Sequence, residues 1–405
     1  MPAALPEGDP APSDGGLPPS ALQGLASTPL AIYVHVPFCL VRCGYCDFNT
    51  YTADQLGPGG SRDDWLAAVQ AEIGLASRVL GPTAPPVSTV FFGGGTPTLM
   101  SPAQLSEVLA VISERFGLQP DAEVTTEANP ETVGPPELAA LRAGGINRLS
   151  LGMQSAVPHV LATLDRVHTP GRAPEVVAEA RAAGFDQVSL DLIYGTPGES
   201  VDDWRRSLDA VCAAAPDHIS AYALVIEAGT AMARTVARGE LEPVDEDRQA
   251  DYYLMAEQVL AEADYHNYEV SNWSRDLASR ARHNLAYWQG ANWWGLGPGA
   301  HSHVGGVRWW NVKHPARYSG ALASGRSPAQ ARETLDAEAR RIERVLLELR
   351  LADGLPVEVL TETERARLPG FADDALLYVD QDRIRLTLRG RLLADAVIRD
   401  LLDWT

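Results

Sequence analysis

Residues 31–46 read Ala31-Ile32-Tyr33-Val34-His35-Val36-Pro37-Phe38-Cys39-Leu40-Val41-Arg42-Cys43-Gly44-Tyr45-Cys46. The apolar run that opens this stretch predicts a buried strand that ends at Pro37. Three cysteines then follow on one short loop, at C-x3-C-x2-C spacing. Thiolates this close in sequence can converge on one soft metal centre, and iron–sulfur clusters are held by such thiolates. Three thiolates leave one iron of a [4Fe–4S] cube without a protein ligand, so a small molecule can bind there.

A disulfide and a zinc site are the two alternatives for these cysteines. Zinc sites share the C-x2-C spacing of Cys43 and Cys46. The sequence has no second Cys or His pair at zinc-finger distance, and Tyr33 and Phe38 flank the loop. Both observations favour a cluster.

The lead-in to the cysteines carries a resemblance to a known family. C-x3-C-x2-C after a strand resembles the radical S-adenosylmethionine (SAM) superfamily. The pattern from Tyr33 through His35, Pro37 and Phe38 to Cys39 is similar to the anaerobic coproporphyrinogen-III-oxidase-like family, which includes the HemW heme chaperones. The resemblance implies a [4Fe–4S] cluster held by Cys39, Cys43 and Cys46, with SAM bound to the open iron. It also implies that an electron from the cluster can cleave SAM to methionine and a 5′-deoxyadenosyl radical.

Composition excludes several classes of function. The 405 residues carry a formal net charge of -20 and a pI of about 4.8. A nucleic-acid partner is not expected, because phosphate binding depends on clustered Lys and Arg, and an acidic surface also disfavours anionic membranes. No apolar run approaches the roughly 20 residues that span a bilayer, and no signal peptide is apparent. Four cysteines do not make a secreted disulfide scaffold, so we expect a cytoplasmic protein without a transmembrane segment.

Hydrophobic patterning divides the chain into four parts. Residues 1–28 are rich in Pro, Gly, Ala and Ser and predict a disordered leader. Residues 29–226 alternate apolar strands with amphipathic helices and form the predicted radical SAM core. Residues 227–326 are an extension with a helix at Asp245–Ala263 and a dense aromatic and glycine region. Residues 327–405 predict a small helical or winged-helix-like domain, with helices at Leu335–Leu351 and Arg389–Leu402.

Six strand–helix units are predicted within the core. The strands are Ala31–Val36, Ser88–Phe92, Glu123–Glu127, Arg148–Gly152, Gln187–Ile193 and His218–Ala223, and the helices are Arg62–Leu80, Pro102–Phe116, Pro135–Ala143, Pro158–Leu164, Ala173–Ala183 and Val201–Ala214. This alternation predicts an α/β fold with a parallel sheet covered by helices. Six strands are too few for a closed eight-fold barrel, so we expect an open, partial (β/α)6 barrel with ligands at the C-terminal strand ends.

Glycines and polar side chains follow these strands where a ligand would bind. The triplet Gly93-Gly94-Gly95, followed by Thr96-Pro97, permits close approach of backbone to a ligand or a tight turn. It resembles the Gly-Gly-Gly-Thr-Pro motif of radical SAM proteins, whose backbone meets the methionyl amine of SAM. Taken singly, each polar residue at the later strand ends also fits a structural role. By order and spacing, the resemblance implies that SAM is bound by Tyr33, Gly94, Gly95, Thr96, Glu127, Gln154, Arg166 and Asp191.

One position separates the oxidases of this family from the chaperones. The oxidase branch resembles C-x3-C-x2-C-x-C, and the position of its fourth cysteine is Phe48 here. Cys212 lies in a helical pattern and is predicted to be a small buried apolar residue. Cys46-Asp47-Phe48-Asn49 is instead similar to HemW. We assign no catalytic residue, and whether the chain is an enzyme stays open.

A second motif lies in the extension. His283-Asn284-Leu285-Ala286-Tyr287-Trp288 is similar to the His-Asn-x-x-Tyr-Trp motif of HemW proteins. The resemblance implies heme contact with His283 as the candidate ligand, since a neutral imidazole can ligate heme iron and aromatic rings offer apolar surface. A structural role for His283 is the alternative, and His301 and His303 are alternative ligands.

The resemblance as a whole implies a heme chaperone. Such a protein binds a [4Fe–4S] cluster, SAM and heme, and transfers heme to acceptor proteins such as respiratory enzymes. The alternative is an oxygen-independent coproporphyrinogen III oxidase, which forms protoporphyrinogen IX by radical oxidative decarboxylation. An electron donor such as a flavodoxin or ferredoxin, and a homodimer, are compatible with either function.

Overall fold

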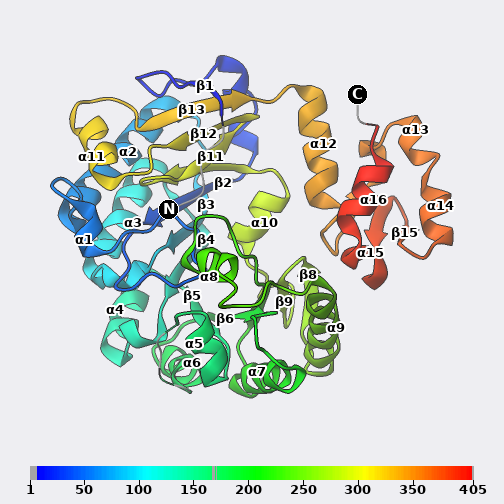
Figure 1. The fold of residues 1–405 in the computed structure, drawn as a ribbon. Coiled ribbons are helices and arrows are strands. Elements are labelled where there is room, and N and C mark those ends of the chain that lie inside the picture. Colours follow the sequence, from blue (N-terminus) through cyan, green and yellow to red (C-terminus); the bar gives the residue numbers. More distant parts are fainter. Residues whose placement is uncertain (1–6, 167–168, 170, 404–405) are drawn as a thin grey trace.

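One strongly curved sheet forms the centre of the molecule (Figure 1). The computed structural model describes residues 7–166, 169 and 171–403. In order across the sheet, the strands are β1 (Asp9–Pro10), β13 (Ala329–Thr334), β12 (Val307–Asn311), β11 (His301–Val304), β10 (Asn292–Leu296), β2 (Leu30–Val36), β3 (Val87–Gly94), β4 (Leu118–Ala128), β5 (Arg148–Gln154), β6 (Gln187–Tyr194), β7 (His218–Ala223), β9 (Asn272–Ser274) and β8 (His266–Glu269). The edge strands β1 and β8 do not pair with each other, so the barrel is open. The predicted α/β class and partial barrel are confirmed.

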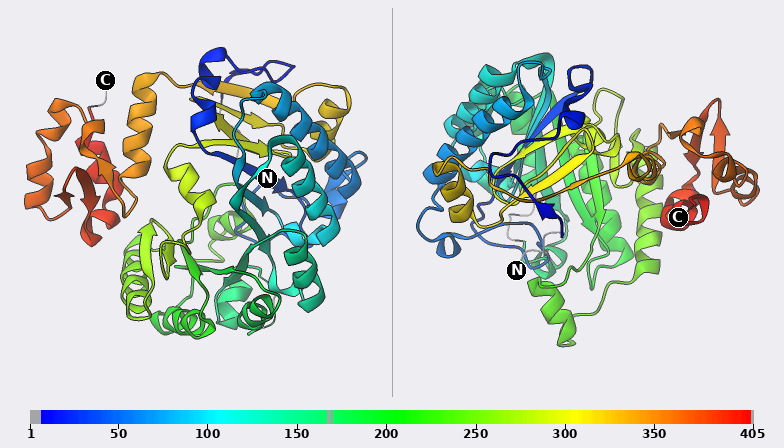
Figure 2. Two further views of the ribbon diagram at one scale, coloured as in Figure 1. Left: turned by 180° about the vertical axis from the view of Figure 1, so that it is seen from behind. Right: turned by 90° about the horizontal axis from the view of Figure 1, so that it is seen from above.

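The six central strands, β2 to β7, run parallel and are joined by helices on the outer side of the sheet (Figures 1 and 2). These helices are α2 (Arg62–Leu80), α3 (Pro102–Phe116), α4 (Pro135–Ala143), α5 (Pro158–Thr163), α6 (Arg172–Ala182) and α7 (Val201–Ala214). Four of the six begin and end at the predicted residues, because local capping fixes their ends. The side chains of Ser61, Ser101 and Ser200 each accept a hydrogen bond from the backbone N–H three residues further on.

The extension enlarges the sheet at both of its sides. β10 pairs in parallel with β2, and β9 pairs antiparallel with β7. A parallel sheet that ended at β2 and β7 would expose unpaired backbone groups, and these strands cover them. The buried carboxylate of Glu72 on α2 accepts hydrogen bonds from the Gly297 N–H (2.9 Å) and the Asn311 side chain (2.8 Å). Core and extension share one hydrophobic cluster, so the predicted boundary at residues 226–227 does not divide the packing.

The leader prediction is wrong for residues 7–28. Their first segment pairs through β1 with β13, and two short 3₁₀ helices follow at Pro19–Leu22 and Leu25–Ser27. Ala21 and Leu25 are buried in the main hydrophobic cluster. The composition suggested disorder because it shows no periodicity, but docking on the sheet supplies the burial that a short segment cannot create alone. Residues 1–6 lie outside the described part of the chain.

The C-terminal part has a hydrophobic cluster of its own and lies to one side of the sheet (Figures 1 and 2). Its elements are α12 (Ala337–Glu348), β14 (Leu355–Pro356), α13 (Glu362–Arg365), α14 (Leu368–Asp373), β15 (Leu377–Asp380), β16 (Arg383–Leu386), α15 (Leu388–Leu392) and α16 (Ala394–Leu401). β14, β16 and β15 form a small antiparallel sheet, which agrees with the winged-helix-like prediction. The predicted helix at Arg389–Leu402 is divided in two at Leu393. Among the described residues, no helix is long and apolar enough to cross a membrane.

Candidate functional site

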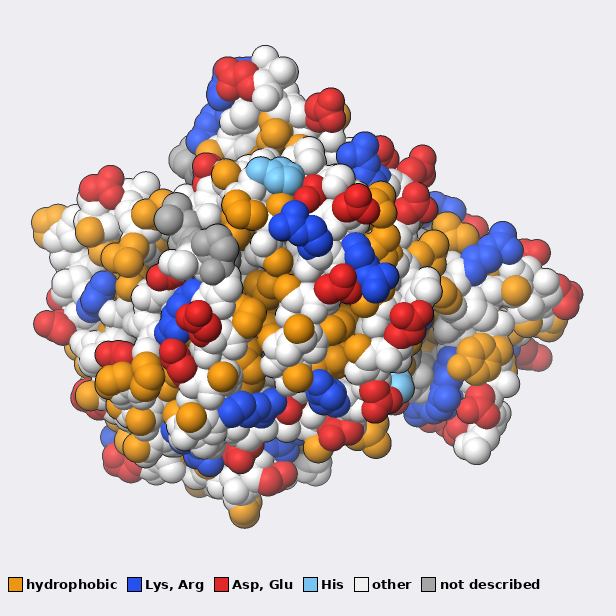
Figure 3. All heavy atoms as spheres, turned by 90° about the horizontal axis from the view of Figure 1, so that it is seen from below, with side chains coloured by type: hydrophobic (Ala, Val, Ile, Leu, Met, Phe, Trp, Pro, Cys, Tyr) orange, Lys and Arg blue, Asp and Glu red, His pale blue; other side chains and the backbone are white. Residues whose placement is uncertain are grey.

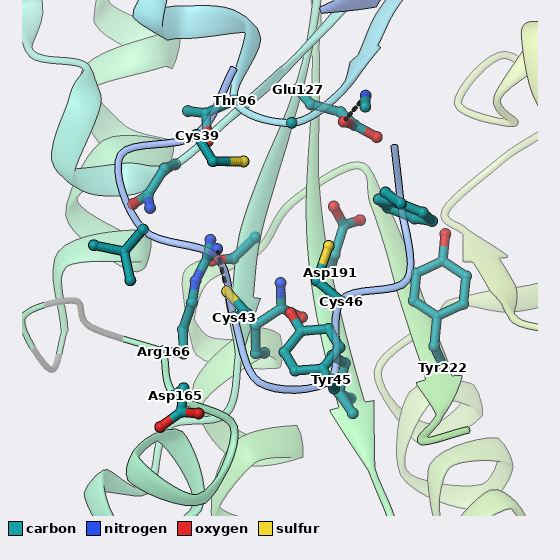
Figure 4. A pocket seen from close by; sticks show the side chains of 18 of the residues that line it. Cys39, Cys43, Tyr45, Cys46, Thr96, Glu127, Asp165, Arg166, Asp191 and Tyr222 are labelled. Atoms are coloured by element: carbon teal, nitrogen blue, oxygen red, sulfur yellow. Dashed lines mark hydrogen bonds between the residues drawn. The ribbon is translucent and has the colours of Figure 1, made fainter. Parts of the chain in front are cut away.

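A cavity of about 980 Å³ opens at the C-terminal ends of the parallel strands (Figure 4). The loop after β2 supplies its three cysteines, and the loop after β3 supplies glycines. Seven of the eight residues predicted to bind SAM line it, and Tyr33 is the exception. The lining residues that the sequence singled out are Cys39, Cys43, Cys46, Gly94, Gly95, Thr96, Glu127, Gln154, Arg166 and Asp191. Residues from five strand ends, up to 152 positions from the first cysteine, therefore meet at one place.

The three cysteines of the loop face this cavity as free thiols (Figure 4). Among the described residues, no three His, Cys, Asp or Glu side chains are arranged to hold a single metal ion. The Arg166 guanidinium lies 3.8 Å from the Cys43 sulfur, and burial raises the pKa of the Cys39 thiol to about 11. Three thiols that line one cavity are a donor set that fits an iron–sulfur cluster.

The glycine triplet is required by its contact with the cysteine loop. The Gly95 N–H donates to the Val36 carbonyl (2.8 Å), and the Thr96 N–H donates to the Phe38 carbonyl (2.8 Å). A Cβ on Gly95 would lie 2.5 Å from the Phe38 oxygen, and one on Gly94 would lie 2.5 Å from the His35 ring. Gly94 also has a φ of 110°, which side chains disfavour. Close packing against the Phe38 backbone explains Gly95, and close packing against the His35 ring explains Gly94, before any ligand is considered.

Among the acidic residues that line the cavity, Glu127 and Asp191 have raised pKa values. Glu127 is the last residue but one of β4 and accepts a hydrogen bond from the Gly94 N–H (3.0 Å). Asp191 on β6 accepts hydrogen bonds from the hydroxyls of Ser150 (2.9 Å) and Ser220 (2.7 Å) on the neighbouring strands. Burial, and then repulsion by Asp191, raise the pKa of Glu127 from 4.5 to about 7. Burial also raises the pKa of Asp191. A cationic ligand would stabilise the ionised form of both carboxyl groups.

Gln154 and Arg166 complete the wall beside Cys43. Gln154 stands at an irregularity in the pairing of β5 with β6 and has a φ of 65°, an uncommon conformation for a residue other than glycine. Arg166 donates to the Gly152 carbonyl (3.1 Å), yet its buried Nε has no hydrogen-bond partner among the described groups. Buried donors are normally satisfied, so an orphan donor in a cavity wall fits a ligand that accepts a hydrogen bond.

A second cavity, of about 340 Å³, adjoins the first. The two share Phe48, Gly94 and Glu127, and Tyr33 lines only the second. The Tyr33 hydroxyl lies 3.0 Å from Nδ1 of His35, whose Nε2 is 2.9 Å from the Asn49 carbonyl. The remaining lining residues are Tyr287, Trp293, Gly299, Ala300 and His301.

His283 does not line either cavity. It lies on α10 (Arg282–Trp288), which packs against β3. Glu123 and Glu127 of the neighbouring strand β4 lie on the same face of the sheet. Its side chain is only 2% exposed, with Nδ1 at 2.8 Å from the Thr89 hydroxyl and Nε2 at 2.9 Å from the Tyr287 hydroxyl. Burial lowers its pKa to about 3. Both nitrogens are engaged, so the geometry favours the structural alternative over heme ligation for His283.

Of the two alternative histidines, only His301 is open. His303 is buried, with Nδ1 near the Ala291 carbonyl (2.9 Å) and Nε2 near the Gly306 N–H (3.2 Å). His301 is exposed and stacks on Trp310 at 5.9 Å between ring centroids. His301 and His303 were equal alternatives at the level of sequence, because only their packing distinguishes them.

Several residues at the site were not predicted. Tyr222 at the end of β7 lines the large cavity, and Asn49 ties the cysteine loop to the extension. The Asn49 side chain donates to the carbonyls of Pro298 (2.9 Å) and Lys313 (2.8 Å). Asn49 lies within the quoted Cys46–Asn49 segment, but nothing in the sequence indicates partners about 250 residues away.

The open barrel and its cysteine-lined cavity are the features of a radical SAM protein. In agreement, the model of the radical SAM superfamily matches residues 33–211. The solved structure of coproporphyrinogen III oxidase (HemN) from Escherichia coli superposes with a TM-score of 0.80 at 24% identity, covering 96% of this chain and 94% of that chain. At this identity the likeness shows the shared fold.

Curated relatives define the family more narrowly. Heme chaperone HemW of Mycobacterium tuberculosis (strain ATCC 25618 / H37Rv) is 54% identical over 387 residues, covering 95% of this chain and 98% of that protein. Heme chaperone HemW of Bacillus subtilis (strain 168) is 30% identical over 374 residues, covering 90% of this chain and 97% of that protein. This chain belongs to the HemW family, and the family resemblance predicted from the sequence is confirmed.

Proposed function

We propose that this chain is a heme chaperone, which binds a [4Fe–4S] cluster, SAM and heme and transfers heme to acceptor proteins such as respiratory enzymes. The proposal is supported by family membership and by the cavity that gathers three thiols, the carboxyl groups of Glu127 and Asp191 and an orphan arginine donor. A cytoplasmic location suits the proposal, because free thiols persist in a reducing compartment.

The observation that carries the chaperone proposal is Phe48. The oxidase pattern has a fourth cysteine at this position, but Phe48 offers an apolar ring that is 57% exposed and lines both cavities. An exposed phenylalanine is costly in water and is suited to contact with a flat apolar ligand. The remaining cysteine, Cys212, packs against the main hydrophobic cluster and does not line either cavity.

In this proposal Cys39, Cys43 and Cys46 hold the cluster. Glu127 and Asp191 offset the positive charge of the SAM ammonium and sulfonium, and Arg166 donates from Nε to an oxygen of the ligand. Gly94, Gly95, Thr96 and Gln154 form the wall, and Tyr33 orients His35 behind it. When bound, the reduced cluster supplies an electron that can cleave SAM, and the protein's part is to position the ligands and exclude water.

Charge is consistent with a partner other than nucleic acid. On the face shown in Figure 3, Lys and Arg are scattered among Asp and Glu and form no continuous basic surface. An electron donor such as a flavodoxin or ferredoxin, and a homodimer, stay predictions.

The test separates a carrier from an oxidase. The protein is reconstituted anaerobically with iron and sulfide, and wild type is compared with Cys43→Ala and with Cys212→Ala as the matched control. Cluster absorbance should fall in Cys43→Ala only. Wild type is then reduced and given SAM with coproporphyrinogen III, and products are separated by chromatography. A parallel sample is titrated with heme and offered to heme-depleted respiratory membranes, with free heme at equal concentration as reference.

If the chain is a heme chaperone, wild type should bind heme and form no porphyrin product. The activity of the respiratory enzymes in the heme-depleted membranes should also recover beyond the level reached with free heme. Formation of protoporphyrinogen together with stoichiometric 5′-deoxyadenosine would refute the chaperone proposal and support a coproporphyrinogen III oxidase. Failure of wild type to bind heme would refute both the carrier role and the choice of cargo.

A further inference from the structure

None of the three loop cysteines lines the second cavity, and most of the residues predicted to bind SAM do not line it either. It lies between the cysteine loop, on the side of Phe48 and Asn49, and the start of β11, where His301 stands. Aromatic rings line it: Phe48 is exposed, and Tyr287 meets Trp293 edge to face at 4.8 Å. The site therefore combines apolar walls with an imidazole at its edge.

The imidazole of His301 differs from the others near it. His35, His283 and His303 have both ring nitrogens within hydrogen-bond distance of a protein group. Neither ring nitrogen of His301 has such a partner in the part of the chain that the structure describes. Its ring is held by stacking on Trp310 and lies near enough to His35 to influence it electrostatically. A positioned imidazole with free nitrogens is a ready metal ligand.

We propose that the second cavity is the heme site and that a ring nitrogen of His301, not of His283, ligates the heme iron. The inference rests on the proposed function for the identity of the cargo and adds the site and the ligand. Neutral imidazole is the form that binds heme iron. Desolvation at the cavity wall, and then the positive charges of Lys313 and Arg308, lower the pKa of His301 below its usual 6.5, which favours the neutral ring.

Lys313 supplies the charge that a heme propionate requires. It is the single lysine of the chain. Its ammonium forms no ion pair with a carboxylate of the described residues, whereas Arg308 is already paired with Glu333 and Glu343. The Lys313 carbonyl accepts a hydrogen bond (2.8 Å) from the side chain of Asn49, which lines the cavity, so Lys313 is joined directly to a residue of the cavity wall. A carboxylate arriving there would gain an unshared partner.

The size of the cavity suits temporary binding. A volume of about 340 Å³ is at the low end for ligand pockets, which range over about 300–1,000 Å³. A macrocycle seated on His301 would keep part of its edge outside, where Phe48 can cover it and an acceptor protein can reach it. His283 contributes indirectly, because it holds Tyr287 in the cavity wall through their 2.9 Å hydrogen bond.

The test is a ferric heme titration followed by absorbance in the Soret region. Wild type is compared with His301→Ala and with His266→Ala, which removes an exposed histidine of β8 outside both cavities. We expect a histidine-ligated spectrum for wild type and His266→Ala, and a dissociation constant raised about tenfold or more in His301→Ala, equivalent to about 1.4 kcal/mol. Added free imidazole should restore the wild-type spectrum to His301→Ala by filling the vacated ligand position.

A second comparison tests the propionate contact. Lys313→Met should weaken binding of heme but not of heme dimethyl ester, which lacks the carboxylate charge. The inference is overturned if His301→Ala binds heme with the wild-type spectrum and affinity, or if His283→Ala alone loses the spectrum while keeping the wild-type thermal midpoint. Absence of heme binding by wild type would instead refute the proposed function, so the two failures are distinguishable.

Discussion

Glu127→Gln should make the cofactor-free protein more stable at alkaline pH and leave it unchanged at acidic pH. Burial and Asp191 raise the pKa of Glu127 from 4.5 to about 7. Each pKa unit corresponds to about 1.4 kcal/mol, so ionising Glu127 costs about 3 kcal/mol more in the folded protein than in the unfolded chain. Glutamine removes this charge and can still accept the hydrogen bond from the Gly94 N–H. Water in the cavity screens the charge, which makes this figure an upper bound.

The direction of this pH dependence follows from the protons that the folded and unfolded states bind. Between pH 4.5 and about 7 the folded protein holds a proton on Glu127 that the unfolded chain has lost. The free energy of unfolding of wild type therefore falls as pH rises through this window, by up to about 1.4 kcal/mol per pH unit at this site. The difference between Glu127→Gln and wild type should be near zero at pH 4.5 and approach about 3 kcal/mol above pH 7.

Urea denaturation of protein without cluster or SAM, followed by tryptophan fluorescence from pH 5 to 8.5, measures this difference. Other buried carboxyl groups also have raised pKa values, Glu72, Glu199 and Glu269 among them, but they are common to both proteins and cancel. Glu114→Gln, on the exposed side of α3, controls for the loss of one negative charge. A difference between Glu127→Gln and wild type that does not change with pH would refute the assignment of Glu127 as a buried, raised-pKa carboxyl.

Three further outcomes are expected. In cluster-loaded wild type, the affinity for SAM should rise by up to about tenfold per pH unit below pH 7, as measured by equilibrium dialysis. Glu127→Gln should abolish most of this pH dependence. If the affinities of Glu127→Gln and wild type for SAM changed equally with pH, a contact between Glu127 and SAM would be contradicted. Gly95→Ala should lower the thermal midpoint and cluster content because its Cβ would lie 2.5 Å from the Phe38 oxygen, whereas Gly370→Ala, with open space, should do neither. Asn49→Ala removes the side-chain donor to the Pro298 carbonyl, while the Lys313 carbonyl keeps the Tyr51 hydroxyl (3.2 Å). The substitution should lower the free energy of unfolding by about 1–3 kcal/mol in urea denaturation and speed cluster loss to a chelator.

Much of the fold follows from the sequence alone. Strand and helix positions in residues 29–226 are local properties: apolar runs alternate with amphipathic segments, and this pattern predicted α2, α3, α4 and α7 at their observed residues. The cysteine spacing and the glycine triplet identified the main cavity for the same reason, since ligand residues close in sequence must be close in space. The family resemblance, through the order and spacing of the strand ends, implied that Glu127, Gln154, Arg166 and Asp191 would meet there.

The tertiary structure decided what depends on contacts distant in sequence. Residues 7–28 have no periodicity, yet they are ordered because β13 and the main cluster offer them a surface. His283 and His301 are alike in a sequence, but Thr89 and Tyr287 occupy both nitrogens of the first, while the second stands free beside a cavity. Hydrogen-bond satisfaction and burial are properties of neighbours up to 194 residues away, so no local pattern could separate the two histidines.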